Sequence, residues 1–368
     1  MFLGREEAIN TFEKSIQKAQ KGYFDHFVIL GGWGIGKTTL LKEYRKIAQS
    51  NGILSSFFPV REFTNNDLLH PVIQVITQIP RNLPTKKERF NKYKDYLSGM
   101  GISFPVIGGG LQFPDKYSYT GDPQVLLLES LLRLWREIKQ ESEIVFILID
   151  DAQNLKNVPE FMTILKNVLS DDEIINNTGF FFILSSIQDW WRQFMKKHHP
   201  IGRYFKPAVR LNNLEIDSVR EIINKILNET GVQFPRNIIE NIYEYSEGHP
   251  FQLQVICDHL YENQMNGRIT NNAFYIALEN TLQELGEIIL DNLYQKASEK
   301  EKLILFKMAE NYRQYDSNDL SEKLNGTIEK NEIRTMLLRL TKKDIIKNIS
   351  RGKYAISSRI LSEYIIRK

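Results

Sequence analysis

Residues 31–38 read Gly31-Gly32-Trp33-Gly34-Ile35-Gly36-Lys37-Thr38, and this short stretch decides the fold. It fits the pattern G-x-x-x-x-G-K-[ST] of a phosphate-binding loop, which requires a strand before it and a helix after it. The flanking sequence meets that requirement, because an apolar run spans residues 27–30 and a helical pattern spans residues 38–49. The alternative is a glycine-rich turn that matches by chance, in about one of a hundred chains of this length.

The loop predicts specific contacts with a nucleotide. Glycines let successive backbone N–H groups converge on phosphate oxygens, and the following helix places its positive end there. We expect Lys37 to contact the β- and γ-phosphates and the Thr38 hydroxyl to bind Mg²⁺. The predicted nucleotide-binding residues are Gly31, Gly32, Trp33, Gly34, Ile35, Gly36, Lys37, Thr38 and Thr39.

A second motif supplies carboxylates. Residues 144–151 read Ile-Val-Phe-Ile-Leu-Ile-Asp-Asp, an apolar strand that ends in two acidic side chains. We expect Asp150 to hold Mg²⁺, directly or through water, and Asp151 to polarise the water that attacks the γ-phosphate. The alternative is a solvated pair of aspartates at a strand end.

The predicted catalytic residues are Asp151 and two further side chains, Ser185 and Arg203. Ser185 follows the apolar strand 180–184, which we expect between the two strands described above, so its hydroxyl could contact the γ-phosphate or the attacking water. A serine that caps the next turn is the alternative. Arg203 stands just before the last strand, 209–211, and is a candidate phosphate-sensing arginine that acts within the chain or on a neighbouring subunit. A solvated surface arginine is the alternative.

Strand and helix patterns alternate through the first part of the chain, with strands expected at residues 27–30, 53–60, 144–149, 180–184 and 209–211. This alternation predicts an α/β domain with a mostly parallel sheet. A basic and then Gly/Pro-rich stretch at about residues 81–122 interrupts it, and we interpret that stretch as an insertion that contains a short hairpin.

The second part of the chain changes in character. Residues 215–283 follow a helical period throughout, and the last ~75 residues read as three helices and then two short strands around Arg351-Gly352, which is the plan of a winged helix. The predicted domains are therefore an α/β domain at 1–213, a helical lid at 214–290 and a winged-helix domain at 291–368.

Composition excludes several classes of protein. The chain has 368 residues with one cysteine, Cys257, and 6 histidines, so a disulfide scaffold and a Cys/His zinc framework are both ruled out. The first residues carry an acidic pair where a signal peptide would be apolar, and no apolar run approaches the ~18 residues that span a bilayer, so we expect a cytoplasmic protein without a membrane partner. The net charge is +3 overall, but residues 299–368 alone carry +6.

The motifs together resemble a known group. Phe-Leu-Gly-Arg-Glu-Glu at the start, the glycine-rich loop, the two aspartates, Ile-Leu-Ser-Ser, the late arginine and Ser246-Glu-Gly-His-Pro-Phe resemble the AAA+/STAND P-loop ATPases. The likeness is closest to the archaeal ATPase families related to origin-recognition initiators, and it covers most of the chain.

This resemblance implies a P-loop NTPase fold that binds ATP or ADP between the α/β domain and the lid. Gly248-His249-Pro250 matches the Gly-x-Pro motif of STAND proteins, so His249 and Pro250 are expected at the nucleotide, where they would couple its state to domain arrangement. A helix-breaking turn is the alternative reading of this segment. Asp151 stands where many AAA+ proteins have glutamate, which leaves the rate of hydrolysis open.

Two functions remain open from the sequence. In the first, an ATP-dependent switch repositions a winged helix that binds double-stranded DNA through Arg334 and Arg339 on its third helix and Arg351 and Lys353 on its wing. In the second, a STAND-type signalling ATPase controls self-association or assembly with a partner protein and does not contact DNA. The positive C-terminal charge favours the first, and Glu329 and Glu332 at the start of the candidate recognition helix favour the second.

Overall fold

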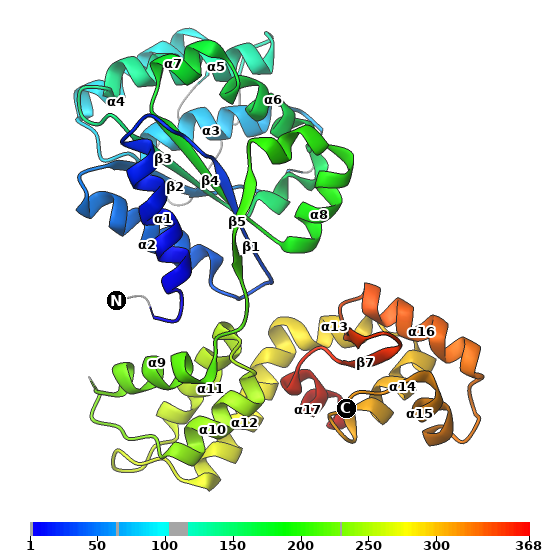
Figure 1. Cartoon of the computed structure of the whole chain (residues 1–368). Helices are drawn as coiled ribbons and strands as arrows, with labels where there is room; N and C mark the ends of the chain where they lie inside the picture. Colours follow the sequence, from blue (N-terminus) through cyan, green and yellow to red (C-terminus); the bar gives the residue numbers. More distant parts are fainter. Residues whose placement is uncertain (1–2, 64–65, 103–116, 229) are drawn as a thin grey trace. The chain divides into compact units, whose positions relative to one another are not determined.

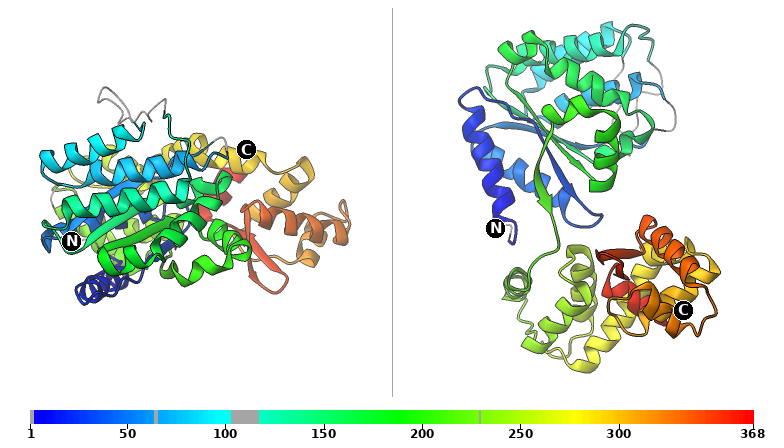
Figure 2. Two further views of the ribbon diagram at one scale, coloured as in Figure 1. Left: turned by 90° about the horizontal axis from the view of Figure 1, so that it is seen from above. Right: turned by 45° about the vertical axis from the view of Figure 1, so that its right-hand side comes forward.

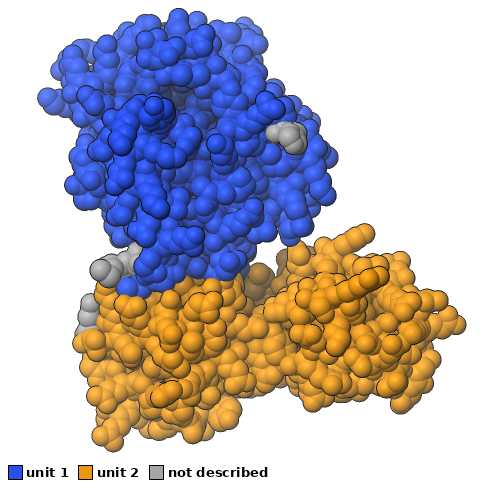
Figure 3. Space-filling model, viewed as in Figure 1, with its two compact units in different colours: residues 1–212 blue, residues 213–368 orange. Residues whose placement is uncertain are grey.

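The computed structural model describes residues 3–63, 66–102, 117–228 and 230–368. The chain divides into two compact units, Met1–Asn212 and Asn213–Lys368 (Figure 3). The predicted further division of the second unit near residue 290 stays a prediction, since one hydrophobic cluster runs through it from Leu214 to Ile365.

The first unit is built on a five-stranded sheet in the order β2-β3-β4-β1-β5, and every neighbouring pair is parallel. The sequence prediction of a parallel α/β sheet is thereby confirmed. All residues of the β1, β3 and β4 strands are buried, as expected for strands covered on both faces. The strands are β1 Phe27–Gly31, β2 Leu54–Pro59, β3 Val145–Asp150, β4 Phe180–Ser186 and β5 Lys206–Leu211.

Helices cover both faces of this sheet (Figure 1 and Figure 2). On one face, α1 (Glu6–Ala19) and α2 (Lys37–Ser50) pack on alternate strand residues such as Ile29 and Phe181. On the other face, the intervening residues, such as Val28 and Phe182, pack against the remaining helices. These are α3 Leu69–Asn82, α5 Pro123–Ile138, α6 Glu160–Leu169, α7 Asp172–Asn177 and α8 Gln188–Lys197.

The predicted insertion contains a helix that the sequence did not reveal, α4 at Lys87–Gly99. Two buried side chains, Tyr93 and Leu97, anchor it, and the Tyr93 hydroxyl donates a hydrogen bond to the carbonyl of Ile76 at 3.2 Å. Because charged and other polar residues fill most other positions, the apolar period of this helix is too sparse to stand out in the sequence. Most of the predicted hairpin falls on residues 103–116, which lie outside the described residues.

The second unit is helical except for one hairpin (Figure 1). Its first helices are α9 Ile216–Asn228, α10 Arg236–Ser246, α11 Pro250–Glu262 and α12 Asn271–Leu285, followed by a π-helical turn at Gly286–Leu290 and α13 Asp291–Gln295. Then come α14 Glu299–Ala309, α15 Ser317–Lys323, α16 Lys330–Lys342, the antiparallel strands β6 Ile346–Ser350 and β7 Lys353–Ile356, and a last helix, α17 Arg359–Ile366.

The order of α14 to β7 is the order expected of a winged helix, while α17 was not predicted. Its buried residues join the cluster of the whole second unit. None of the helices in the described part of the chain has the length and apolar character that crossing a bilayer requires.

Candidate nucleotide site

The glycine-rich loop joins β1, at the centre of the sheet, to α2. Gly34 and Gly36 have positive φ angles of 68° and 98°, which other residues adopt only with strain. Gly31 is needed for a different reason, because a Cβ there would lie 2.6 Å from Cγ2 of Ile35 and 3.2 Å from the carbonyl oxygen of Leu211. The loop therefore turns tightly and leaves its backbone N–H groups at the start of α2, which is the geometry that binds phosphate.

Lys37, the first residue of α2, is buried within this loop. Its Nζ donates hydrogen bonds to the carbonyl oxygens of Gly32 at 2.7 Å and Gly31 at 3.2 Å. Burial lowers the pKa of Lys37, and the carboxylates of Asp151 and Asp150 act in the opposite direction. The amine and the two carboxylates are thus close enough to interact electrostatically, as a site for a nucleotide phosphate and its cation requires.

Asp150 ends β3 and is buried, at 2% exposure. Its Oδ1 accepts a short hydrogen bond from the Ser185 hydroxyl and a second, at 3.1 Å, from the backbone N–H of Asp151. The Ser185 oxygen in turn accepts a hydrogen bond from that same N–H at 3.1 Å. Ser185 lies on β4, between β3 and β1, as predicted from the sequence, and in this structure its hydroxyl orients Asp150.

Asp151 has a left-handed backbone, with φ 57°, at the point where β3 turns into a 3₁₀ helix. Such a conformation is strained for a non-glycine residue and occurs often at functional sites. Gln153 holds it there: its side-chain amide donates to Oδ1 of Asp151 at 2.8 Å and its oxygen accepts from the N–H of Ile187 at 3.2 Å. Sequence reasoning missed Gln153, although its place two residues after the acidic pair was visible.

Arg5 is a second residue that sequence reasoning did not assign to the site. Its guanidinium donates a hydrogen bond of 3.1 Å to the carbonyl of Ile35 inside the loop, and burial lowers its pKa. The helix that follows, α1, is fixed to α2 by Phe12, whose ring stacks on Tyr44 with centroids 4.2 Å apart. The N-terminal segment therefore supports the loop from outside the sheet.

Mg²⁺ fits the chemistry of this edge of the sheet. The Asp150 carboxylate and the exposed Thr38 hydroxyl are oxygen donors, which this cation prefers, and Mg²⁺ usually takes only one or two carboxylates together with substrate phosphates. Within the residues that the structure describes, no three or more His, Cys, Asp or Glu side chains are grouped to hold a metal ion by themselves. The oxygen donors of Asp150 and Thr38 fit a cation that nucleotide phosphates also hold.

Arg203 lies at the opposite edge of the sheet. It ends a short 3₁₀ helix, His199–Arg203, before β5 begins, whereas Lys37 and Asp150 lie where β1 and β3 end. Its side chain is exposed and lines a cavity of about 330 Å³ with Asp25 and Lys206, among others. The structure does not bring Arg203 to the phosphate-binding loop of its own chain.

The Gly-His-Pro turn lies in the second unit, between α10 and α11. His249 is the N-cap of α11, with its Nδ1 3.5 Å from the N–H of Gln252, and Pro250 is the first residue of that helix. Gly248 has a φ of 74°. The predicted contact of His249 and Pro250 with nucleotide stays a prediction.

The four candidate DNA-contact residues are all exposed, but the two on α16 point to different sides of that helix. Arg334 and Arg339 are five residues apart, which turns their side chains about 140° from each other around the helix. Arg334 Nε donates to the Ser317 hydroxyl at 3.3 Å. Arg351 and Lys353 lie together at the tip of the β6–β7 hairpin.

A parallel sheet in this strand order, with the glycine-rich loop after its central strand and a buried aspartate at the end of a neighbouring strand, defines a P-loop ATPase of the AAA+ type. The family model of the ATPase domain found predominantly in Archaea matches residues 2–256. The chain belongs to this family, and ATP binding and hydrolysis are its general activity.

Solved structures agree on the fold. A Walker-type ATPase of Pyrococcus abyssi is 19% identical, with a TM-score of 0.60 over 99% of this chain and 96% of that one. The ORC2 protein of Aeropyrum pernix, solved in ADPNP–ADP complexes, is 16% identical, with a TM-score of 0.64 over 100% of this chain and 93% of that one. None of the curated proteins matches the chain in sequence.

Proposed function

We propose that this protein is a slow, Mg²⁺-dependent ATPase that acts as a molecular switch. In this proposal, ATP binding and hydrolysis in the first unit change the conformation of the second unit and so reposition its C-terminal segment, residues 291–368. The observation that carries the switch is a side-chain bridge from Glu247, directly before the Gly-His-Pro turn, to that C-terminal segment.

The Glu247 bridge uses both carboxylate oxygens. Oε1 accepts a hydrogen bond from the Tyr312 hydroxyl at 2.8 Å, and Oε2 accepts one from the backbone N–H of Arg359 at 3.1 Å. Lys347 Nζ lies 3.6 Å from Oε1, and the Arg359 guanidinium lies over the Tyr312 ring, 5.4 Å from its centroid. Burial, together with Glu247, raises the pKa of Tyr312, so its hydroxyl keeps the proton that it donates.

The backbone beside this bridge is tightly constrained. Glu247 and Gly248 are both left-handed, with φ angles of 49° and 74°. A Cβ on Gly248 would lie 2.0 Å from the carbonyl oxygen of Leu214, whose N–H donates to the Gly248 carbonyl at 2.8 Å. Leu214 follows the end of β5 by three residues, so this contact supports a path from the sheet through the turn to the C-terminal segment.

The residues of the loop have distinct roles in this proposal. Lys37 and the loop N–H groups bind the phosphates, and Thr38 and Asp150 hold Mg²⁺, which when bound neutralises phosphate charge. Asp151 orients the attacking water and accepts its proton, while Ser185 and Gln153 fix the two aspartates. The A. pernix ORC2 structures with ADPNP and ADP support ATP and ADP as the ligands.

Slow hydrolysis is supported by the environment of Asp151. Its Oδ1 already accepts a hydrogen bond from Gln153, so this oxygen must share or give up that bond to orient the attacking water. A switch also benefits from slow turnover, because each nucleotide state then lasts long enough to be detected by other molecules.

We further propose that the C-terminal segment contacts the phosphates of double-stranded DNA. The net charge of +6 over residues 299–368 supports it, as do the exposed Arg351 and Lys353 at the hairpin tip. Since phosphate contacts carry no sequence information, this binding would be largely independent of base sequence.

A partner protein in place of DNA is the second candidate. It is favoured by α16 itself, where Leu338 is 56% exposed and Glu332 forms an ion pair of 2.7 Å with Lys300. An exposed leucine and a carboxylate on the helix offered to DNA fit a protein surface better than a phosphate backbone.

The ATPase proposal is tested by titration calorimetry and phosphate release on three variants. Lys37→Ala should lose tight ATP binding, Asp151→Asn should bind ATP but turn over at least ~100-fold more slowly, and Lys42→Ala, an exposed lysine of the same helix, should match the parent. If Asp151→Asn hydrolyses ATP at the parental rate, Asp151 does not have its proposed role. If Lys37→Ala binds ATP with parental affinity, the glycine-rich loop does not bind the nucleotide as proposed.

The switch is tested separately, by small-angle scattering of the full chain with ADP and with ADPNP. The radius of gyration should differ between the two ligands in the parent and in Tyr275→Phe, an exposed control on α12, and should differ less in Tyr312→Phe, which removes one hydrogen bond of the Glu247 bridge. Equal radii for both ligands in the parent would reject the switch.

A further inference from the structure

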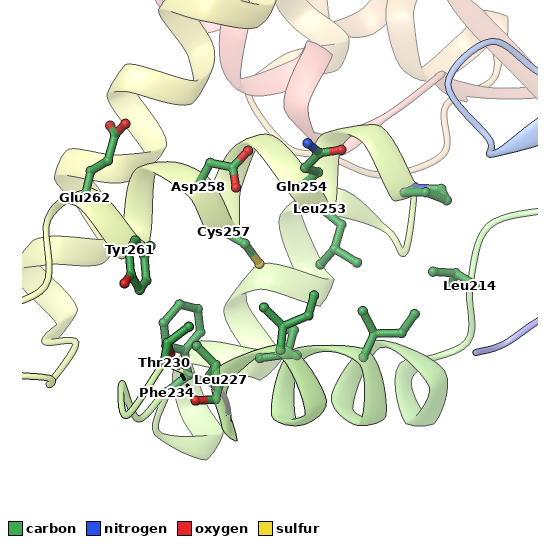
Figure 4. A pocket seen from close by; sticks show the side chains of 14 residues that line it. Leu214, Leu227, Thr230, Phe234, Leu253, Gln254, Cys257, Asp258, Tyr261 and Glu262 are labelled. Carbon is green, nitrogen blue, oxygen red and sulfur yellow. Dashed lines mark hydrogen bonds between the residues drawn. The ribbon is translucent and has the colours of Figure 1, made fainter. Parts of the chain in front are cut away.

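An apolar groove runs through the first helices of the second unit, between α9 and α11 (Figure 4). Both helices pack on α10, and the space that remains between them has a volume of about 760 Å³. Every residue that lines it lies between Leu214 and Glu262, so the groove is complete within this unit. At one end the groove shares Leu214 and Pro250 with the Gly-His-Pro turn and its contacts, but none of the residues of the Glu247 bridge line it.

The floor of the groove follows a helical stripe on each side. Ile223 and Leu227 come from α9, Leu253 comes from α11, and all three are buried. Cys257 lies one turn beyond Leu253, and burial raises the pKa of its thiol to about 12, so it acts here as a neutral, apolar side chain. Figure 4 shows Leu253 and Cys257 pointing from α11 into the space above α9.

The rim of the groove exposes large apolar side chains to solvent. Ile226 on α9 is 59% exposed and Tyr261 on α11 is 47% exposed, and both line the groove. Apolar side chains of this size, gathered beside a concave surface, mark an interaction site more often than chance. The length of α11 makes the groove about 20 Å long, which equals three to four turns of a helix.

One side of the rim is negatively charged. Asp258 and Glu262, four residues apart on α11, line the groove there. Burial raises the pKa of Asp258, and Glu284 and Glu262 raise it further, although a hydrogen bond from Gln254 acts in the opposite direction. His259 bridges the two glutamates, at 2.9 Å from Glu284 and 3.4 Å from Glu262. A cation opposite Asp258 would relieve this repulsion.

We propose that the groove between α9 and α11 binds an amphipathic helix of a partner protein, whose apolar stripe packs on Ile226, Leu253, Cys257 and Tyr261 and whose lysine or arginine pairs with Asp258 and Glu262. The open, elongated shape and the apolar floor fit a helix laid along the groove with anchors one turn apart. The acidic rim selects a basic helix over an acidic one. This binding requires neither ATP hydrolysis nor DNA.

The test uses the full chain and a fluorescein-labelled probe peptide of about 16 residues, helical by design, with leucines at one-turn spacing and two flanking lysines. A second peptide carries glutamates in place of the lysines, and a third carries serines in place of the leucines. Fluorescence anisotropy should show binding of the lysine peptide, binding at least ~10-fold weaker of the glutamate peptide, and none of the serine peptide.

Variants of the protein assign the binding to the groove. Ile226→Glu should weaken the affinity for the lysine peptide ~10-fold or more. The control is Ile276→Glu, at an isoleucine that is 45% exposed on α12 and lies outside the groove, and it should leave that affinity unchanged. The double variant Asp258→Lys/Glu262→Lys should reverse the preference in favour of the glutamate peptide. A purely structural role of these carboxylates would not produce that reversal, and thermal melting checks that each variant folds.

Three results would overturn the proposal. The first is that no peptide binds, and the second is that the isoleucine variants on α9 and α12 weaken binding equally. The third is sedimentation that shows a dimer of the parent which Ile226→Glu dissociates, because the occupant would then be a second copy of this chain.

Discussion

Acid should destabilise the first unit through one histidine, His26, which lies directly before the central strand β1. Burial lowers the pKa of His26 to about 4 from its usual 6.5, and Asp25 opposes this only weakly. The ring is 8% exposed, its Nδ1 accepts a hydrogen bond from the N–H of Phe182 at 3.2 Å, and it stacks on Phe205. The folded state therefore holds His26 neutral.

The sign and size follow from this difference. Below pH 6.5 the unfolded chain binds a proton at His26 that the folded chain does not, so the free energy of unfolding falls as pH falls towards 4. With a shift of about 2.5 pKa units, the loss from this residue is about 2 kcal/mol at pH 5 and about 3 kcal/mol at pH 4. Between pH 7 and 8 the contribution of His26 to the free energy of unfolding changes by only about 0.1 kcal/mol.

Urea unfolding between pH 4 and 8, followed by circular dichroism, measures this effect. His26→Asn keeps an acceptor near the position of Nδ1 but cannot take up a proton, so its stability should fall less steeply with acid than that of the parent, by the amounts given above. Equal slopes in the two proteins would refute a buried neutral histidine.

Three further predictions concern function and folding. Gly248→Ala should destabilise the second unit by more than the ~1–2 kcal/mol that a left-handed alanine costs, because its Cβ would also clash with Leu214. Gly231→Ala is the control: it has a φ of 72° and no atom within 4 Å of the added Cβ, so it should cost only that amount. Thermal unfolding compares the two variants. Arg203→Ala and Lys37→Ala should each lose most ATPase activity alone. A mixture of the two should recover part of it, because the Arg203→Ala chain supplies an intact phosphate-binding loop and the Lys37→Ala chain supplies an intact arginine. A mixture as inactive as its components would exclude action between chains. Replacing Arg351 and Lys353 together by alanine should weaken binding to all duplex sequences alike, and the slope of log affinity against log salt concentration should become flatter by up to ~2 units. If the parent protein shows no duplex binding at low salt, the partner-protein function is favoured instead.

The parts of this molecule that sequence predicts are those whose cause is local. The glycine-rich loop lies between a strand and a helix because residues 31–38 and their neighbours alone determine that turn. The break between α10 and α11 at residues 247–249 follows equally from Gly248 and from Pro250, which begins α11. The helix α4 escaped prediction because only Tyr93 and Leu97 of its residues are buried, too few to reveal an apolar period among its polar residues.

The support of the site could not be predicted, since it depends on contacts between distant segments. Arg5 reaches a carbonyl 30 residues away, Ser185 reaches Asp150 35 residues away, and Glu247 reaches Arg359 112 residues away. No spacing or composition encodes such pairs. The sequence indicates which side chains bear the chemistry, and the tertiary fold decides which others orient them.

Arg203 shows how the polarity of the sheet constrains mechanism. All five strands run in the same direction. The carboxyl ends of the strands therefore carry the glycine-rich loop and Asp150, and the opposite ends carry the residues that precede each strand. Arg203 precedes β5, whose six residues span about 20 Å at ~3.3 Å each, which is farther than an arginine side chain reaches. An arginine at this edge is remote from the phosphates of its own chain, and if it senses phosphate it does so on another subunit. Self-association would then be part of catalysis, and the activity per chain would rise with protein concentration.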